Sequence, residues 1–351
     1  MPPEIFSDTG RIKPIFKDGK FANPFPVKGG ALGVDHKGVF KARLDNKAIT
    51  RPPKYLPAEP VDIEKAFPEN VEGLYVTWLG HSSSIVQIDG VRILLDPVLK
   101  NNISPVPLFS IKRFQKEAPV NAEELPFIDA VFISHNHYDH LDRRAIEALK
   151  SKVGVFITTV GVGDILRGWG IDSAKVRDFT WWQEGTFKGS SGQTLKFACT
   201  PARHFSVRGP FDRNETLWAS WVLIGPVHKV FYSGDTGYEV HFRQIGHHYG
   251  PFDLTFMENG QYSIYWPTNH MVPEEGVKAH LELKGKYMIP VHWGTFNLSI
   301  HDWWEPPERV SKEALEKGVN LLTPRIGQTL SIDENPATSA WWREYIGHIT
   351  P

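Results

Sequence analysis

Short apolar runs separated by turn residues dominate the chain from residue 73 onward and predict a core rich in β-strands. Three consecutive runs have strand composition: LYVTWLG (74–80), SSIVQIDG (83–90) and VRILLDP (91–97). Asp89-Gly90, between the second and third runs, is a hairpin signal. The run IDAVFIS (128–134) indicates a buried strand. Further strands are predicted at 154–159, 195–202, 217–225, 228–234, 253–258 and 287–292.

Apolar residues with helical spacing lie between several of these runs. They predict helices at 141–152, 239–248, 273–284 and 309–317. Strands that alternate with helices predict sheets covered by helices, so we assign the chain to the α/β class. Ligand-type side chains recur where the predicted strands end, which is where a functional site is expected.

The first 70 residues differ from the rest of the chain. They are rich in Pro, Gly, Lys and Phe and show weak periodicity. We interpret residues 1–70 as an extended arm packed on a single domain formed by residues 71–351, with a short helix near 61–67. The aromatic residues of this arm argue against wholesale disorder.

Composition and charge exclude several classes of protein. Of the 351 residues, 41% are hydrophobic and 23% charged, and the formal net charge is −1, so no nucleic-acid partner is expected. The single cysteine, Cys199, excludes an internal disulfide and a thiolate-rich zinc site. The chain shows no signal-peptide pattern and no run of ~18 apolar residues. We therefore expect a cytoplasmic protein.

Residues 134–142, SHNHYDHLD, bring three histidines and two aspartates into one short turn after a predicted strand. Imidazole and carboxylate are the ligands that zinc and similar ions favour when thiolates are absent. His135 and His137, two residues apart at a strand end, can bind one ion. Asp139 and His140 can face a second ion about 3.5–4 Å away. Burying these groups without a metal would leave several polar atoms unmatched.

Two ions with three or four protein ligands each, one of them shared, need about seven ligands, so the cluster is incomplete by itself. His204, Asp235 and His292 each follow a predicted strand and are the remaining candidates. Asp235 is the natural bridging carboxylate, with His204 completing one ion and His292 the other. A water or hydroxide would take the remaining bridging position, where metal lowers its pKa from ~15.7 toward ~7.

Several motifs resemble the metallo-β-lactamase superfamily over roughly residues 70–330. They are WLGHSSSIVQIDG (78–90), LLDPV (94–98), SHNHYDHLD (134–142), PARHFSVRG (201–209), SGDTGY (233–238), HMVPEE (270–275) and VHWGTF (291–296). Within the superfamily, they look like the branch of N-acylphosphatidylethanolamine-hydrolysing phospholipase D and its bacterial relatives. The stretch ENGQYSIYWPTNHMVPEE (258–275) departs from the eukaryotic pattern, because it is shorter and lacks a Pro-Arg pair. The resemblance therefore implies the metal chemistry but not the identity of the substrate.

The resemblance implies an αββα sandwich with a binuclear site between its two sheets. It implies two zinc ions, with manganese or iron as alternatives, and assigns the ligands as His135, His137 and His204 for one ion, Asp139, His140 and His292 for the other, and Asp235 as the bridge. This agrees with the assignment from spacing.

Other residues are candidates for supporting roles. His81 is either a partner of the ligands or a buried histidine in a strand turn, and Asp96 either orients a ligand histidine or caps a turn. His270 joins Asp139 and Asp235 as a candidate catalytic residue, because it can contact substrate or protonate a leaving group. The alternative for His270 is a helix-entry role. Weaker pocket candidates are Tyr238, Gln261 and Tyr262.

Residues 99–119 mix apolar side chains with Lys112, Arg113 and Lys116. This composition suits a patch that contacts lipid headgroups, which makes peripheral membrane contact an option. The alternative is an ordinary surface loop whose apolar residues pack on the domain. The oligomeric state is left open by the sequence.

The function that these features favour is a metal-dependent hydrolase, in which a metal-bridging hydroxide attacks the phosphodiester of an N-acyl-phosphatidylethanolamine-like lipid. The alternative is a lactonase or another carboxyl-ester or amide hydrolase that acts on a small substrate. One form of this alternative has a phosphorylated substrate. A di-iron redox centre is disfavoured, because no flavin partner domain is recognisable. A metal-binding module without catalysis is disfavoured too, and β-lactamase activity is expected only as a side reaction.

Overall fold

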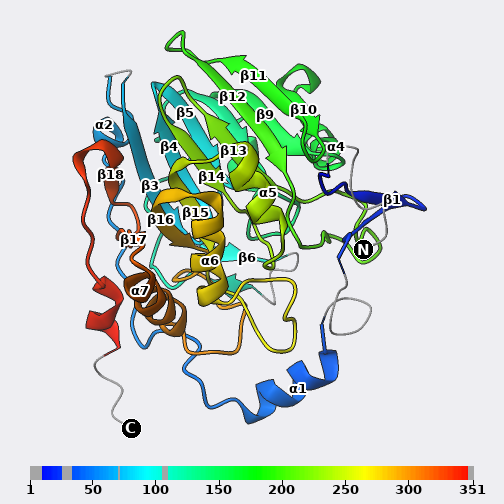
Figure 1. Cartoon of the computed structure of the whole chain (residues 1–351), viewed down its shortest axis with the longest axis vertical. Coiled ribbons are helices and arrows are strands. Elements are labelled where there is room, and N and C mark those ends of the chain that lie inside the picture. Colours follow the sequence, from blue (N-terminus) through cyan, green and yellow to red (C-terminus); the bar gives the residue numbers. More distant parts are fainter. Residues whose placement is uncertain (1–9, 26–33, 70–71, 105–109, 347–351) are drawn as a thin grey trace.

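Two seven-stranded sheets form the centre of the computed structural model, which describes residues 10–25, 34–69, 72–104 and 110–346 (Figure 1). The first sheet has the order β10 (Val176–Phe179), β9 (Val153–Thr159), β8 (Ile128–Phe132), β5 (Val91–Leu95), β4 (Ser83–Ile88), β3 (Leu74–Gly80) and β18 (Thr329–Ser331). The second has the order β11 (Glu184–Lys188), β12 (Thr194–Thr200), β13 (Ser220–Ile224), β14 (Lys229–Tyr232), β15 (Phe252–Glu258), β16 (Gly285–Val291) and β17 (Asn320–Leu321).

The alternation of side chains along each strand explains why the sheets are buried on both faces. On β5, Ile93 and Leu95 belong to the core between the two sheets, whereas Leu94 belongs to the core on the other face of its sheet. On β13 of the second sheet, Trp221 and Leu223 face inward and Val222 faces outward. Both sheets therefore have an inner apolar face for each other and an outer one for helices.

Helices cover the two outer faces and complete four layers. Those packed on the first sheet are α2 (Ile63–Ala66), α3 (Arg143–Leu149) and α4 (Val162–Gly168). Those packed on the second sheet are α5 (His241–His248), α6 (Pro273–Leu283) and α7 (Glu305–Lys317). Short 3₁₀ turns are η3 (Ser173–Lys175), η4 (Ile332–Glu334) and η5 (Trp341–Tyr345). The predicted αββα sandwich is thereby confirmed.

The predicted strands and helices from residue 74 to residue 317 are all present, with bounds that shift by a few residues. The elements that were not predicted have weaker patterns. Strand β11, EGTFK, alternates between exposed and half-buried positions, so it lacks an apolar run. Helix α4, VGDILRG, contains two glycines, which are poor helix formers, and its N-cap Gly161 has φ +86°.

The segment before residue 70 packs on the two-sheet body through a few side chains. Ile12, Phe21 and Leu56 are buried in the core between the sheets. A hairpin of β1 (Ile15–Lys17) and β2 (Lys20–Ala22) carries Phe21, and helix α1 (His36–Asp45) follows. The short helix predicted near 61–67 is α2, whereas α1 was not predicted.

Residues 99–119 contain a two-stranded hairpin of β6 (Asn102–Ile103) and β7 (Ile111–Lys112), while residues 105–109 lie outside the described part of the chain. Arg113 is buried, with its guanidinium over the Phe296 ring at 5.7 Å. It is therefore not available to a headgroup, which removes one of the three cations of the predicted lipid contact. Among the described residues, no helix has the length and apolar character that crossing a bilayer requires.

An Asp–His–Asp cluster joins the far ends of both sheets. His228 Nδ1 lies 2.6 Å from Asp89 Oδ1, and His228 Nε2 lies 2.8 Å from Asp333 Oδ1. Asp89 follows β4, His228 precedes β14 and Asp333 follows β18. Hydrogen bonding to Asp89, opposed by burial and assisted by Asp333, raises the pKa of His228 to about 9.

We predict that this cluster stabilises the fold in a pH-dependent way. Because the pKa of His228 is raised in the folded state, its contribution is complete below the ordinary value of 6.5 and is lost as the pH rises through about 9. His228→Gln should lower the free energy of unfolding by on the order of 2 kcal/mol near pH 6 and by much less near pH 10. Denaturant unfolding at both pH values measures this, with the exposed His247→Gln as control. An equal loss at both pH values would contradict the charged state of His228.

Candidate metal centre

The candidate ligands meet because strand ends from both sheets converge on one place. In the first sheet, β8 leads into the turn that carries His135, and β3 ends one residue before His81. In the second sheet, β14, β15 and β16 run parallel, so their carboxyl ends share one edge of the sheet. Asp235 and His292 follow two of these strands. The pattern of ligand-type residues at strand ends thus predicts the meeting point correctly.

One group of buried or half-buried ligand atoms comprises His135, His137, His204 and Asp235, whose atoms all lie within 4.8 Å of one another. Asp235 Oδ2 lies 3.8 Å from His135 Nε2 and 3.6 Å from His204 Nε2. His204 Nε2 lies 3.2 Å from His137 Nδ1. Two of these side chains come from one turn and two from separate strand ends, as expected from the sequence.

The second group comprises His81, Asp139, His140 and His292, again with all ligand atoms within 4.8 Å. Asp139 Oδ2 lies 2.9 Å from His81 Nε2 and 3.2 Å from His292 Nε2. Asp235 also reaches this group, with Oδ1 3.0 Å from His140 Nε2 and Oδ2 3.3 Å from His292 Nε2. Asp235 is therefore the carboxylate that touches both groups.

The donor atoms of this site suit a divalent metal, because several of them form no hydrogen bond with one another. His135 Nε2, His137 Nε2, His140 Nε2 and Asp235 Oδ1 are buried and have no hydrogen-bond partner. His140 Nε2 and Asp235 Oδ1 lie 3.0 Å apart without an aligned hydrogen bond. Buried polar atoms are normally paired, so four such atoms within the two ligand groups indicate a site for cations.

The protonation states of the first group suit metal binding as well. Burial lowers the pKa of His135 and of His204 well below the ordinary range of histidine, and lowers the pKa of His137 to about 4. These three imidazoles are therefore neutral at pH 7, and the neutral ring is the form that ligates metal. For His140, burial opposes the charged ring, but Asp235 and Asp139 outweigh burial and raise the pKa of His140.

Asp96 fixes the orientation of His140. Its Oδ2 accepts hydrogen bonds from His140 Nδ1 at 2.7 Å, from Ser134 Oγ at 2.5 Å and from Tyr232 O–H at 2.6 Å, while Oδ1 accepts from Ser134 N at 2.7 Å. With Nδ1 held in this way, Nε2 of His140 is the atom left to face Asp235. Of the two roles expected for Asp96, the contact with a candidate ligand histidine is present.

His81 combines both roles that the sequence left open. Its ring contacts Asp139, while its backbone sits in a tight turn with φ +52° after β3. The carbonyl of His81 accepts a hydrogen bond from the backbone N–H of His292 at 2.9 Å, so this turn also ties the two sheets together.

Glu258 was not predicted, although it is part of the site. It is the last residue of β15 and is fully buried. Its Oε1 hydrogen-bonds His270 Nδ1 and lies 3.6 Å from His292 Nδ1, and its Oε2 accepts from Thr236 N at 2.8 Å. The rings of His270 and His292 stack with centroids 5.3 Å apart. The only signal in the sequence was an acidic residue closing the apolar run DLTFME.

Two glycines allow the chain to pass close to the site. Gly234, next to Asp235, has φ +55°, and a Cβ there would lie 2.8 Å from the carbonyl oxygen of Ala219. A Cβ at Gly260 would lie only 1.6 Å from the carbonyl oxygen of His292. Both positions therefore require glycine to keep the neighbouring ligand in place.

A cavity of about 370 Å³ opens above the two groups. It is lined by Val34, His36, Val39, Arg43, His137, Asp139, His204, Phe205, Asp235, Gln261, Trp266, Asn269, His270, His292 and Leu298. Of the weaker pocket candidates, Gln261 lines this cavity. Tyr238 and Tyr262 do not, because their hydroxyls bind Glu282 and Glu305 instead.

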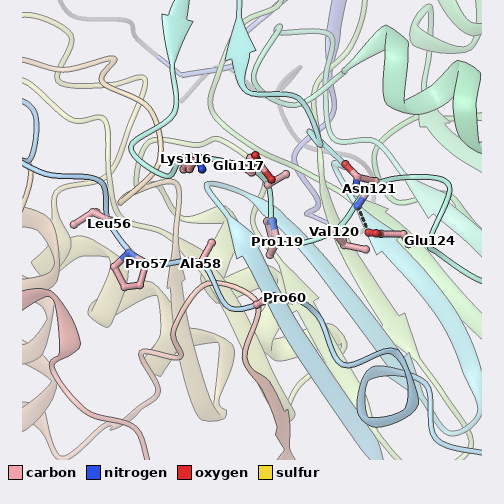
Figure 2. A pocket seen from close by; sticks show the side chains of 11 residues that line it. Leu56, Pro57, Ala58, Pro60, Lys116, Glu117, Pro119, Val120, Asn121 and Glu124 are labelled. Atoms are coloured by element: carbon pink, nitrogen blue, oxygen red, sulfur yellow. Dashed lines mark hydrogen bonds between the residues drawn. The ribbon is translucent and has the colours of Figure 1, made fainter.

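A second cavity, of about 480 Å³, lies between residues 56–60 and 116–124 (Figure 2). Its lining includes prolines, Lys116, Glu117 and a hydrogen-bonded pair of Asn121 and Glu124. None of its lining residues is a histidine, an aspartate or a cysteine. We therefore attribute the chemistry of the chain to the cavity above the histidines.

We predict that Asp96→Asn weakens metal binding by about 10–100-fold, the effect typical of losing a partner that orients a ligand. The amide would oppose the N–H of His140 Nδ1 with an N–H group of its own. Asp129→Asn is the matched control, because Asp129 is also buried and accepts backbone hydrogen bonds from Arg92 and Ser190 at the other end of β8. Titration with zinc against a competing chelator measures both affinities. Equal affinities in the two variants would contradict the orienting role.

Comparison with known proteins agrees with this geometry. A family model described as a beta-lactamase superfamily domain matches residues 91–293. An uncharacterised protein of Mycobacterium tuberculosis is 39% identical over 97% of this chain and 92% of its own. N-acyl-phosphatidylethanolamine-hydrolyzing phospholipase D 1 of Caenorhabditis elegans is 31% identical over 92% of this chain and 96% of its own. Igni18, a metallo hydrolase from Ignicoccus hospitalis, has a TM-score of 0.56 at 23% identity, covering 74% of this chain and 98% of its own. With its two packed sheets and its histidine–aspartate site, this chain belongs to the metallo-β-lactamase superfamily.

Proposed function

We propose that this chain is a binuclear zinc-dependent hydrolase of the phospholipase D type, which cleaves the phosphodiester of N-acyl-phosphatidylethanolamine-like lipids. The observation that carries the proposal is the pair of ligand groups that share Asp235 at the floor of a cavity. The hydrolase class follows from the family, and the C. elegans relative supports the choice of bond.

In this proposal, His135, His137 and His204 would hold one ion and Asp139, His140 and His292 a second. Asp235, which contacts both groups, would be the shared carboxylate. Zinc suits a site made of imidazoles and carboxylates, and manganese or iron are accommodated by the same ligands. When bound, two such ions supply Lewis acidity and a hydroxide nucleophile at neutral pH.

The chain itself contributes the proton transfer and the orientation of the ligands. His270 lines the cavity and its Nδ1 is held by Glu258, which leaves Nε2 to give a proton to the departing alkoxide. The hydrogen bond to the buried Glu258 fixes the orientation of the His270 ring. Asp96 and His81 hold His140 and Asp139 in position.

The cavity wall favours a lipid over a small polar substrate. Five lining residues that do not belong to the ligand groups are apolar: Val34, Val39, Phe205, Trp266 and Leu298. Its volume of about 370 Å³ suits a headgroup and the first part of a chain. Arg43 and His36 also line it, and they favour the second candidate, a lactonase or other carboxyl-ester or amide hydrolase acting on a small phosphorylated substrate.

Product analysis separates the two candidates. Zinc-loaded protein is incubated with detergent-dispersed N-acyl-phosphatidylethanolamine, and the products are identified by mass spectrometry. The proposal predicts N-acylethanolamine and phosphatidate. Their absence, with two bound zinc ions confirmed, rejects the lipid substrate and directs the search to lactones and small phosphodiesters.

We predict that His137→Ala loses metal and activity together. Removing one imidazole breaks the first group, so bound metal should fall and the hydrolysis rate should drop by more than about 10²-fold. Metal analysis and turnover of the same preparation measure both effects. His280→Ala is the matched control, because His280 is also buried but hydrogen-bonds Thr255 outside the site. Unchanged metal content in His137→Ala would reject the assignment.

We predict that Asp235→Asn reduces the metal content of the protein from two ions toward one. The amide keeps the shape of the side chain but lacks the charge that two nearby cations need. Metal analysis after dialysis and the rate of hydrolysis test this prediction. Hydrolysis at the parent rate would reject the bridging role.

A further inference from the structure

Helix α1 (His36–Asp45) lies at the edge of the molecule and is attached at its N-terminal end (Figure 1). The backbone N–H of Asp35 donates to the carbonyl of Tyr265 at 2.7 Å, and the Asp35 side chain caps the helix by accepting from Gly38 N at 2.9 Å. A Cβ on Gly38 would lie 2.4 Å from the Tyr265 ring, so the helix touches the loop there. None of its ten residues is buried.

The exposure of α1 leaves it without the usual source of helix stability. Helices shorter than ~12–15 residues are marginal in water, and in proteins most of their stability comes from packing an apolar face. Phe40 and Leu44, neighbours at i and i+4, are 68% and 71% exposed. A partner that covers these two side chains would therefore stabilise the helix.

The residues of α1 divide between a face toward the cavity and a face toward solvent. His36, Val39 and Arg43, at helical spacing, line the cavity above the metal centre. Phe40 and Leu44 lie on the side away from Gly38, the position that contacts the loop. Lys37 and Lys41, also one turn apart, flank the two apolar side chains on the same outer side.

The surface around α1 is more basic than the chain as a whole. Between residues 35 and 47, four cations (Lys37, Lys41, Arg43, Lys47) and two anions (Asp35, Asp45) leave a net charge of +2, against −1 for the whole chain. Ile264, in the loop that holds α1 at Tyr265, is 83% exposed. Exposed apolar side chains next to lysines suit contact with an anionic lipid surface, because the apolar pair can enter the interface while the lysines attract the charged headgroups.

We infer that the outer face of α1, with Ile264, docks the protein on an anionic lipid surface. Because the inner face of the same helix lines the cavity, docking brings the cavity next to the lipid headgroups. The inference deepens the proposed function by naming the surface from which the substrate is taken. It also assigns the membrane contact to α1 and no longer to residues 99–119, where Arg113 is buried.

Binding to vesicles tests this inference without any need for turnover. The full, zinc-loaded chain is sedimented with vesicles of phosphatidylcholine alone or mixed with phosphatidylglycerol. We expect binding to the mixed vesicles that weakens with salt. Lys37→Gln with Lys41→Gln should weaken it by about fivefold for each lysine removed. Phe40→Ser with Leu44→Ser should weaken it by about tenfold or more.

The matched control is Phe127→Ser with Leu315→Ser, two apolar residues that are 45% and 84% exposed on other elements. It should bind as the parent does. Every variant should keep its metal content and its hydrolysis of a water-soluble phosphodiester, because none of the four α1 residues touches the ligand groups.

Three results would overturn the inference: no binding to either vesicle, equal binding to both, or parent-like binding by both α1 variants. If sedimentation velocity instead shows that the Phe40 and Leu44 pair holds two copies of the chain together, the face is a protein contact and the inference is wrong. Vesicle binding without hydrolysis of N-acyl-phosphatidylethanolamine would reject the proposed substrate while leaving the docking surface in place.

Discussion

Buried imidazole nitrogens without hydrogen-bond partners are the feature on which the rest of the structure depends. Three such nitrogens, on His135, His137 and His140, and one oxygen of Asp235 lie within the two ligand groups. Leaving them unpaired costs several kcal/mol in total, because each buried polar atom has given up its hydration. The two sheets must bring the ends of β8, β12, β14 and β16 to this site, and Asp96, Glu258 and the turn at His81 then hold the side chains in place.

The parts of the site that could be predicted from the sequence are those with local signals. The turn at 134–142 places four candidate ligands within six residues, and His204, Asp235 and His292 each follow an apolar run. Asp96 follows a predicted strand, and its contact with His140 is one of the two roles expected for it. In these cases, strand periodicity and chemistry point to the same place.

The parts that could not be predicted depend on contacts between distant residues. Glu258 lies near His292 because β15 pairs with β16, and it contacts His270 because the segment after β15 folds back toward it. Helix α1 packs no side chain into the core, since none of its residues is buried, so no core-facing periodicity marks it in the sequence. Strands β11 and β18 are edge strands, where exposure weakens the apolar pattern. Both roles considered for His81 are present, because the tight turn that contains its backbone also directs its ring toward Asp139.

Strand β18 has a consequence for how the protein is made. It closes the first sheet by pairing with β3, and Thr77 and Thr329, joined by a 2.7 Å hydrogen bond, are 252 residues apart in the chain. While the protein emerges from the ribosome, this edge of β3 stays unpaired until β18 has been synthesised. His292 also lies far downstream of β3 in the chain. A product truncated before β18 would therefore carry an open sheet edge prone to aggregation, and one truncated before His292 would also lack a member of the histidine cluster.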